Sequence, residues 1–280
     1  MTSELSRKKR KIRLLYVLLV ICIIAVIVSA SGIVRELYAT RQGRSYYTTL
    51  SADIETRPRS PGYSRPTENG SSTGTGSNDN GTNDFDHGFD DYIWEPYVDF
   101  EALGSRFHGA KAWIKLEGTL IDYPIMQWTD NYYFLGRLPD GTIHRSGSIF
   151  LDFRNNADFS DKHSLIYGHE SRTEDMFGAL KNYRRQAFYD ENPVIHIYTP
   201  ERDYELVLFA AYLVDSGVEV PPLRFNDESS FEAYINDLKR RSLFRSNVEV
   251  SPDDRIVSLC TCAYDYTNAR LIIVGKLVEF

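Results

Sequence analysis

The chain has 280 residues, three cysteines and a formal net charge of −7 at pH 7; 42% of its residues are hydrophobic and 25% are charged. These values are typical of a globular protein, and they exclude a wholly disordered chain or a protein with many membrane spans. Three cysteines cannot build a disulfide framework. Because basic residues gather before Leu14, the rest of the chain is acidic, and we expect no nucleic-acid partner.

The first predicted element is a membrane span. Residues 14–33 read LLYVLLVICIIAVIVSASGI, which is long enough as a helix to cross a bilayer and contains no charge. The basic residues of the tail, 1–13, precede it, so the positive-inside rule places the N-terminus in the cytoplasm and the remainder of the chain outside the cell. A cleaved signal peptide is the alternative, but its apolar part is usually 7–15 residues. We therefore predict a retained, single-pass signal-anchor in the cell membrane.

Residues 34–89 are predicted to form a flexible extracytoplasmic linker. Within them, 67–84 read TENGSSTGTGSNDNGTND and contain no apolar residue. Such a segment cannot bury enough surface to offset the entropy of ordering its backbone. A folded domain is expected over 90–280, where aromatic residues return.

The pattern of residues 90–280 predicts a mainly β domain with peripheral helices. Pro96, Tyr97, Phe100, Leu103 and Phe107 are spaced as in one amphipathic helix. Further helices are predicted over 175–183 and 228–244. Short runs rich in Val, Ile, Tyr and Phe, separated by turn residues, predict eight strands and favour a closed or nearly closed barrel. These runs are 112–116, 121–126, 148–151, 163–167, 194–199, 204–214, 255–262 and 270–278.

The last two predicted strands carry the clearest chemical signal. Cys262 ends one strand and Arg270 begins the next, so a hairpin can bring both to one end of a sheet. A guanidinium favours the nucleophilic thiolate and offers donors to an oxyanion. A thiol nucleophile also needs a proton-transfer partner, and His169 follows a predicted strand and a glycine, where active-site residues are often placed. From spacing alone, a buried thiol beside a salt-bridging arginine remains the alternative.

Several motifs in order resemble those of sortases, the cell-wall transpeptidases of Gram-positive bacteria, and of class B in particular. Ser258-Leu-Cys-Thr-Cys262 is similar to the TLxTC signature, and Tyr167-Gly-His169 to the histidine motif. Arg270 followed by an apolar strand resembles the arginine strand of that family. Further similar pieces are Gly118-Thr-Leu-Ile-Asp-Tyr-Pro-Ile-Met-Gln127, Ser148-Ile-Phe-Leu-Asp152, Val274-Gly-Lys-Leu-Val278 and the helix predicted before the cysteine strand.

This resemblance implies an eight-stranded sortase-type β-barrel with an N-terminal helix, and a cysteine transpeptidase that uses no cofactor and no metal. Cys262 would be the nucleophile, His169 the general acid/base, and Arg270 the residue that positions substrate and stabilises the oxyanion. The enzyme would cleave a C-terminal sorting motif of surface proteins after Thr through a thioacyl-enzyme. It would then transfer the protein to an amine of the peptidoglycan precursor or cross-bridge.

The resemblance also implies substrate-binding positions and shows departures from the family pattern. Asn131 and Leu135 match positions where class B enzymes contact the sorting peptide. Cys260 occupies the variable signature position, two residues from Cys262, so it could line the same groove, form a strained disulfide with Cys262 under oxidation, or simply pack. Glu170 follows the histidine where an amide is common, and its carboxylate is expected to favour the charged imidazolium.

Two other interpretations remain open at this point. The acceptor could be a Lys amine of a pilin subunit, as in class B enzymes that polymerise pili. Alternatively, the domain could be a catalytically silent extracellular binding module, or hold a metal through Cys260, Cys262 and His169. The metal alternative lacks the further CxxC or HxxxH pattern that a four-ligand zinc site needs.

Overall fold

A computed structural model describes residues 2–54, 98–171, 173–262 and 268–280; for 2–15, 17 and 262 it describes the backbone alone. Eight strands close into a barrel in the order β1-β2-β3-β4-β7-β8-β6-β5. This confirms the predicted fold, and each strand lies within two residues of its predicted range. The strands are β1 Ala110–Lys115, β2 Asp122–Met126, β3 Ile149–Leu151, β4 His163–Gly168, β5 Val194–Tyr198, β6 Asp203–Asp215, β7 Arg255–Cys262 and β8 Ala269–Glu279.

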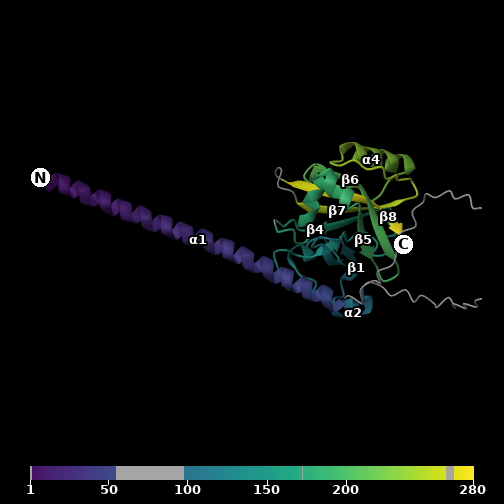
Figure 1. The fold of residues 1–280 in the computed structure, drawn as a ribbon, viewed down its shortest axis with the longest axis horizontal. Coiled ribbons are helices and arrows are strands. Elements are labelled where there is room, and N and C mark those ends of the chain that lie inside the picture. Colours follow the sequence, from purple (N-terminus) through teal and green to yellow (C-terminus); the bar gives the residue numbers. More distant parts are fainter. Residues whose placement is uncertain (1, 55–97, 172, 263–267) are drawn as a thin grey trace, which may run out of the picture.

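Strand alternation divides the apolar residues of β7 between two clusters. Val257 and Leu259 belong to the main core, which fills the barrel, whereas Ile256 and Cys260 belong to a second cluster on the outer face. Helix α4, Glu228–Arg241, covers that outer face with Phe231, Ile235 and Leu238; Figure 1 shows it lying across β6. Both faces of this part of the sheet are therefore buried, which explains why β7 and β8 read as nearly continuous apolar runs.

The shorter helices differ in detail from the prediction. Helix α2, Phe100–Arg106, begins after Asp99, whose side chain accepts a hydrogen bond from the Ala102 N–H; Pro96 and Tyr97 lie outside the described residues. The predicted helix over 175–183 is the 3₁₀ helix η2, Gly178–Arg184, followed by α3, Gln186–Glu191. A second 3₁₀ helix, η1, spans Tyr133–Gly136.

Helix α4 ends three residues before its predicted end, and the reason is packing. Ser242 is extended, and the Leu243 N–H donates to the Ala211 carbonyl at 2.7 Å, so the chain leaves the helix to bind β6. Phe244 then stacks on Tyr189 with ring centroids 4.0 Å apart. Phe244, the last residue of the predicted helix, therefore belongs to the main core and not to α4.

Helix α1, Thr2–Ile54, extends well beyond the predicted span and projects from the body as a single long rod (Figure 1). Part of it, Leu18–Ile54, qualifies by length and composition as a candidate membrane span. Residues 34–54, predicted as part of the flexible linker, are helical instead, and Tyr47, Leu50 and Ile54 are buried in the main core. The rest of the predicted linker, 55–89, lies outside the described residues.

Candidate active site

Three neighbouring strands bring the predicted catalytic residues to one end of the sheet. In the antiparallel pair β7–β8, Cys262 stands opposite Arg270. In the parallel pair β4–β7, Gly168 stands opposite Thr261, and His169 follows immediately. The backbone therefore places His169, Cys262 and Arg270 at the same level of β4, β7 and β8, although they are distant in sequence. The side chain of Cys262 lies outside the described residues.

The backbone of His169 is held by the turn over residues 173–177, which folds back onto the end of β4. The Phe177 N–H donates to the His169 carbonyl at 3.0 Å, and Glu170 and Met176 form an isolated antiparallel bridge. A Cβ at position 168 would lie 2.4 Å from the Phe177 ring, so only glycine allows the ring to close over the strand end. The turn thus fixes the position of His169 at the end of β4.

The half-buried imidazole of His169 favours its neutral form. Burial lowers its pKa below the ordinary value, and the positive charge of Arg145 lowers it further. Glu170, expected to favour the charged imidazolium, is not among the causes of this shift, and the net shift runs toward the neutral form. A neutral imidazole at neutral pH can accept a proton from a thiol.

The guanidinium of Arg270 lies at the start of β8 and is partly buried. Its Nη1 donates to the Ala269 carbonyl at 3.0 Å, which fixes the head group near the strand end. A guanidinium carries five N–H donors in a rigid plane, so one such bond leaves capacity to bind a substrate carbonyl or oxyanion.

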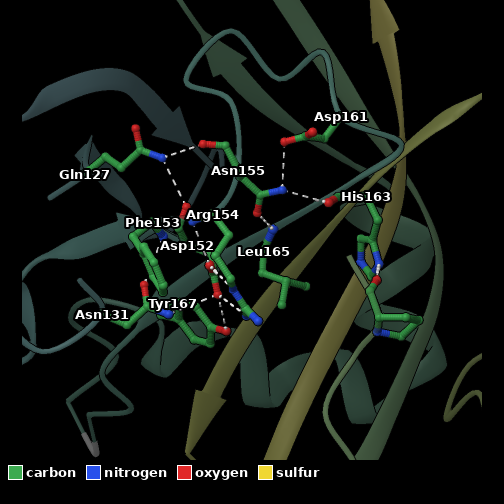
Figure 2. A network of polar contacts seen from close by, with 11 residues as sticks. Gln127, Asn131, Asp152, Phe153, Arg154, Asn155, Asp161, His163, Leu165 and Tyr167 are labelled. Atoms are coloured by element: carbon green, nitrogen blue, oxygen red, sulfur yellow. Dashed lines mark hydrogen bonds and ion pairs between the residues drawn. The ribbon is translucent and has the colours of Figure 1, made fainter. Parts of the chain in front are cut away.

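Beside this strand end, the fully buried carboxylate of Asp152 connects three segments (Figure 2). The Tyr167 hydroxyl donates to its Oδ2 at 3.1 Å and the Asn131 amide donates at 3.0 Å. Arg154 forms a two-pronged ion pair with it at 2.8 Å. Burial alone would raise the pKa of Asp152, but the bonds from Arg154 and Asn131 outweigh burial and keep it below its usual value.

The three predicted substrate-binding residues lie in different surroundings. Asn131 is committed to the scaffold, because its amide donates to Asp152 and its Oδ1 accepts from the Phe153 N–H at 3.0 Å. Leu135 is exposed on η1. Cys260 is buried in the outer cluster beneath α4, which agrees with packing, the simplest of its expected roles.

Sequence reasoning assigned no role to Asp152 or Tyr167, although both lie in motifs that it noted. The signal that could have found them is a carboxylate directly after the apolar strand β3 and a tyrosine two residues before His169. Because Tyr167 and the histidine leave the same strand end, Asp152 also anchors the strand that carries His169.

We expect Asp152→Asn to lower the free energy of unfolding by about 2–3 kcal/mol at pH 7, because it removes a buried acceptor of several hydrogen bonds and leaves Arg154 without its ion-pair partner. Denaturant unfolding would measure this. As the pKa of Asp152 is depressed in the folded state, the difference from wild type should be present at neutral pH. It should shrink as the pH falls below about 3.9, the ordinary pKa of an aspartate, and through the lower folded value.

Asp237→Asn serves as the matched control, since Asp237 pairs with Arg240 and Arg241 on the surface of α4. Its loss should change stability by no more than about 0.5 kcal/mol. Equal effects of the two substitutions would contradict the structural role of Asp152.

Comparisons with known proteins agree with the fold and with the family that the motifs resemble. No family model matches the chain. A Sortase B of Listeria monocytogenes is 38% identical over 168 residues, which cover 59% of this chain and 68% of the relative. A Sortase B of Staphylococcus aureus is 32% identical over 182 residues, 64% of this chain and 75% of the relative.

Solved structures give the same result. A Staphylococcus aureus sortase B-substrate complex is similar with a TM-score of 0.62 and 31% identity, over 64% of this chain and 84% of that one. A sortase B complexed with triglycine is similar with a TM-score of 0.61 and 32% identity, over 64% of this chain and 85% of that one. With these relatives, the barrel and the three converging motifs, the chain belongs to the sortase B family of cysteine transpeptidases.

Proposed function

We propose that this chain is a membrane-anchored transpeptidase that cleaves a C-terminal sorting motif after Thr and transfers the protein to a peptidoglycan amine. In this reaction the Cys262 thiolate attacks the Thr carbonyl. The tetrahedral intermediate expels the following residue as an amine, which takes a proton from the His169 imidazolium. The acceptor amine then attacks the thioester carbonyl and loses a proton to His169, and the thiolate leaves with the new amide formed.

The register of β4, β7 and β8 is the observation that carries this proposal. A nucleophile, a base and an oxyanion donor must lie within reach of one carbonyl carbon. Cys262 is opposite Arg270, and His169 follows the residue opposite Thr261. A depressed pKa leaves His169 neutral and able to take the thiol proton, which supports its role as the base.

Helix α1 supports the proposed location. Its apolar stretch is a candidate membrane span that follows a basic tail, which favours an N-terminus in the cytoplasm and a catalytic domain outside the cell. The relatives support the partners: a sortase B of Staphylococcus aureus has been crystallised as a substrate complex, and a sortase B has been crystallised with triglycine, a peptide whose free amine resembles a cross-bridge acceptor.

The decisive experiment incubates the full chain in detergent micelles with a panel of sorting-motif peptides, with and without acceptor amines. Mass spectrometry should detect a thioacyl adduct on the peptide that contains Cys262, and a transpeptidation product when a glycine-based amine is present. Product with a Lys side-chain amine alone would favour pilin polymerisation. Absence of adduct and product across the panel would refute the proposed reaction.

Arg270→Lys tests the oxyanion role. Lysine keeps the charge but lacks the planar set of donors, so we expect kcat to fall about 10²- to 10³-fold with a smaller change in KM. Arg202→Lys is the matched control, because Arg202 makes a surface ion pair with Glu279 at 3.0 Å on the same barrel. Full activity of Arg270→Lys in the peptide assay would contradict the assignment.

A further inference from the structure

The part of α1 that follows its apolar stretch, residues 36–54, contacts both loops beside His169. One loop, residues 173–178, contains the turn whose Phe177 N–H binds the His169 carbonyl. The other, residues 144–148, carries Arg145, whose charge lowers the pKa of His169. Both contacts join residues about 100 or more positions apart in sequence, and both are polar.

Arg44 makes the contact with the first loop. Its Nε donates to Asp175 Oδ1 at 2.8 Å and its Nη2 donates to Oδ2 at 3.2 Å, a bidentate pair. Nη2 also donates to the Thr173 carbonyl at 3.1 Å. Asp175 is only 7% exposed, so its carboxylate depends on this partner far more than a surface carboxylate would.

The segment that Arg44 holds is connected by hydrogen bonds to His169. The Gly178 N–H donates to the Asp175 carbonyl at 2.9 Å, and the Phe177 N–H donates to the His169 carbonyl. Met176, between them, has φ 55°, a left-handed conformation that costs a non-glycine residue free energy and persists only where surrounding contacts impose it. The Met176 N–H donates to the Tyr123 hydroxyl at 3.0 Å, and the Tyr123 ring packs edge-on against Tyr47 of α1.

The second loop is held by the same face of α1. Arg145 lies 3.5 Å from a carboxylate oxygen of Glu36, and a ring nitrogen of His144 lies 3.0 Å from the Ala39 carbonyl oxygen. The absence of a side chain at Gly43 permits this approach, since a Cβ there would lie 2.8 Å from the His144 ring. The Tyr47 hydroxyl donates to the Gly147 carbonyl at 3.0 Å.

We infer that Arg44 is a positioning residue for the catalytic histidine: its bidentate pair with Asp175 fixes the turn that holds His169, so residues 36–54 of α1 belong to the catalytic unit. The inference rests on the proposed role of His169. It gives the helix that continues from the predicted membrane span a part in the geometry of the active site, through Asp175 and the turn.

The test uses the full chain in detergent micelles and three variants, Arg44→Ala, Arg44→Lys and Asp175→Asn. Arg106→Ala is the matched control. Arg106 lies in α2 and also forms an ion pair with α1, to Asp53 at 3.3 Å. We expect amide hydrogen exchange at Met176 and Phe177 to speed up at least tenfold in Arg44→Ala and Asp175→Asn, and to be unchanged in the control. The value of kcat for peptide cleavage should fall about 10- to 100-fold with KM changed less than threefold, and Arg44→Lys should recover part of it.

The exchange measurement needs no turnover, so it separates this inference from the proposed function. If the wild-type chain cleaves no peptide, the proposed function fails, while exchange at Phe177 still tests the role of Arg44. The inference is overturned if Arg44→Ala matches Arg106→Ala in exchange and in kcat. It is also overturned if exchange rises over the whole barrel to the same extent, because Arg44 would then support the fold in general.

Discussion

Cys262→Ala should leave no thioacyl-enzyme and reduce transpeptidation to background. Removing the nucleophile of a comparable acyl-transfer enzyme costs about 10⁶-fold in kcat, because the remaining groups have no covalent step to assist. The measurement is the rate of product formation from a sorting-motif peptide and an amine, together with intact-mass analysis for the acyl adduct.

Cys260→Ala is the matched control, since it removes a thiol two residues away on the same strand. Cys260 is buried beneath α4, so its loss should cost about 1 kcal/mol of stability and leave the rate close to wild type. If Cys260→Ala were inactive and Cys262→Ala active, Cys260 would be the nucleophile, and the assignment made from the motif would be refuted.

The strands and the meeting of three motifs could be predicted because their signals are local. Apolar runs between turn residues define the strands, and each motif sits at the end of one. Once Cys262 and Arg270 are assigned to adjacent strands of a hairpin, their proximity follows from antiparallel pairing. The parallel pairing of β4 with β7 brings His169 to the same level, and only the family resemblance indicated that these strands would be neighbours.

The docking of α1 could not be predicted from the features considered, because most of residues 35–46 are polar and conceal the continuation of the helix. Tyr47, Leu50 and Ile54 are spaced three and four residues apart and form the buried stripe. That stripe is short and lies beside a long polar stretch, so composition favoured a linker. The contact of Arg44 with Asp175 spans 131 positions, and no local pattern encodes such a pair.

Asp152 illustrates a different limit of prediction from sequence. A buried carboxylate is stable only with several partners, and its partners Asn131, Arg154 and Tyr167 come from separate loops and strands. The sequence shows a carboxylate after a strand but not which donors the barrel closure will bring to it. The same closure brings the amide of Asn131 to Asp152, and its contact with substrate stays a prediction.

His169→Ala is expected to lower kcat for transpeptidation by about 10²- to 10⁴-fold, the usual contribution of a positioned general acid/base. His108→Gln provides the control, because His108 is exposed in the turn between α2 and β1 and should retain the wild-type rate. Both variants should unfold at nearly the same denaturant concentration as the wild type. An active His169→Ala variant would remove this residue from the mechanism.

The pH dependence tests the same residue through its charge. Because burial and Arg145 lower the pKa of His169, the neutral base persists below pH 6.5, the ordinary value for histidine, and the acid limb of kcat/KM should lie below that pH. In His169→Ala the limb that belongs to the imidazole should disappear, while His108→Gln should leave the whole profile in place. An acid limb above pH 6.5 in the wild type would mean that the charged form is favoured, and the base in the first step would have to be another group.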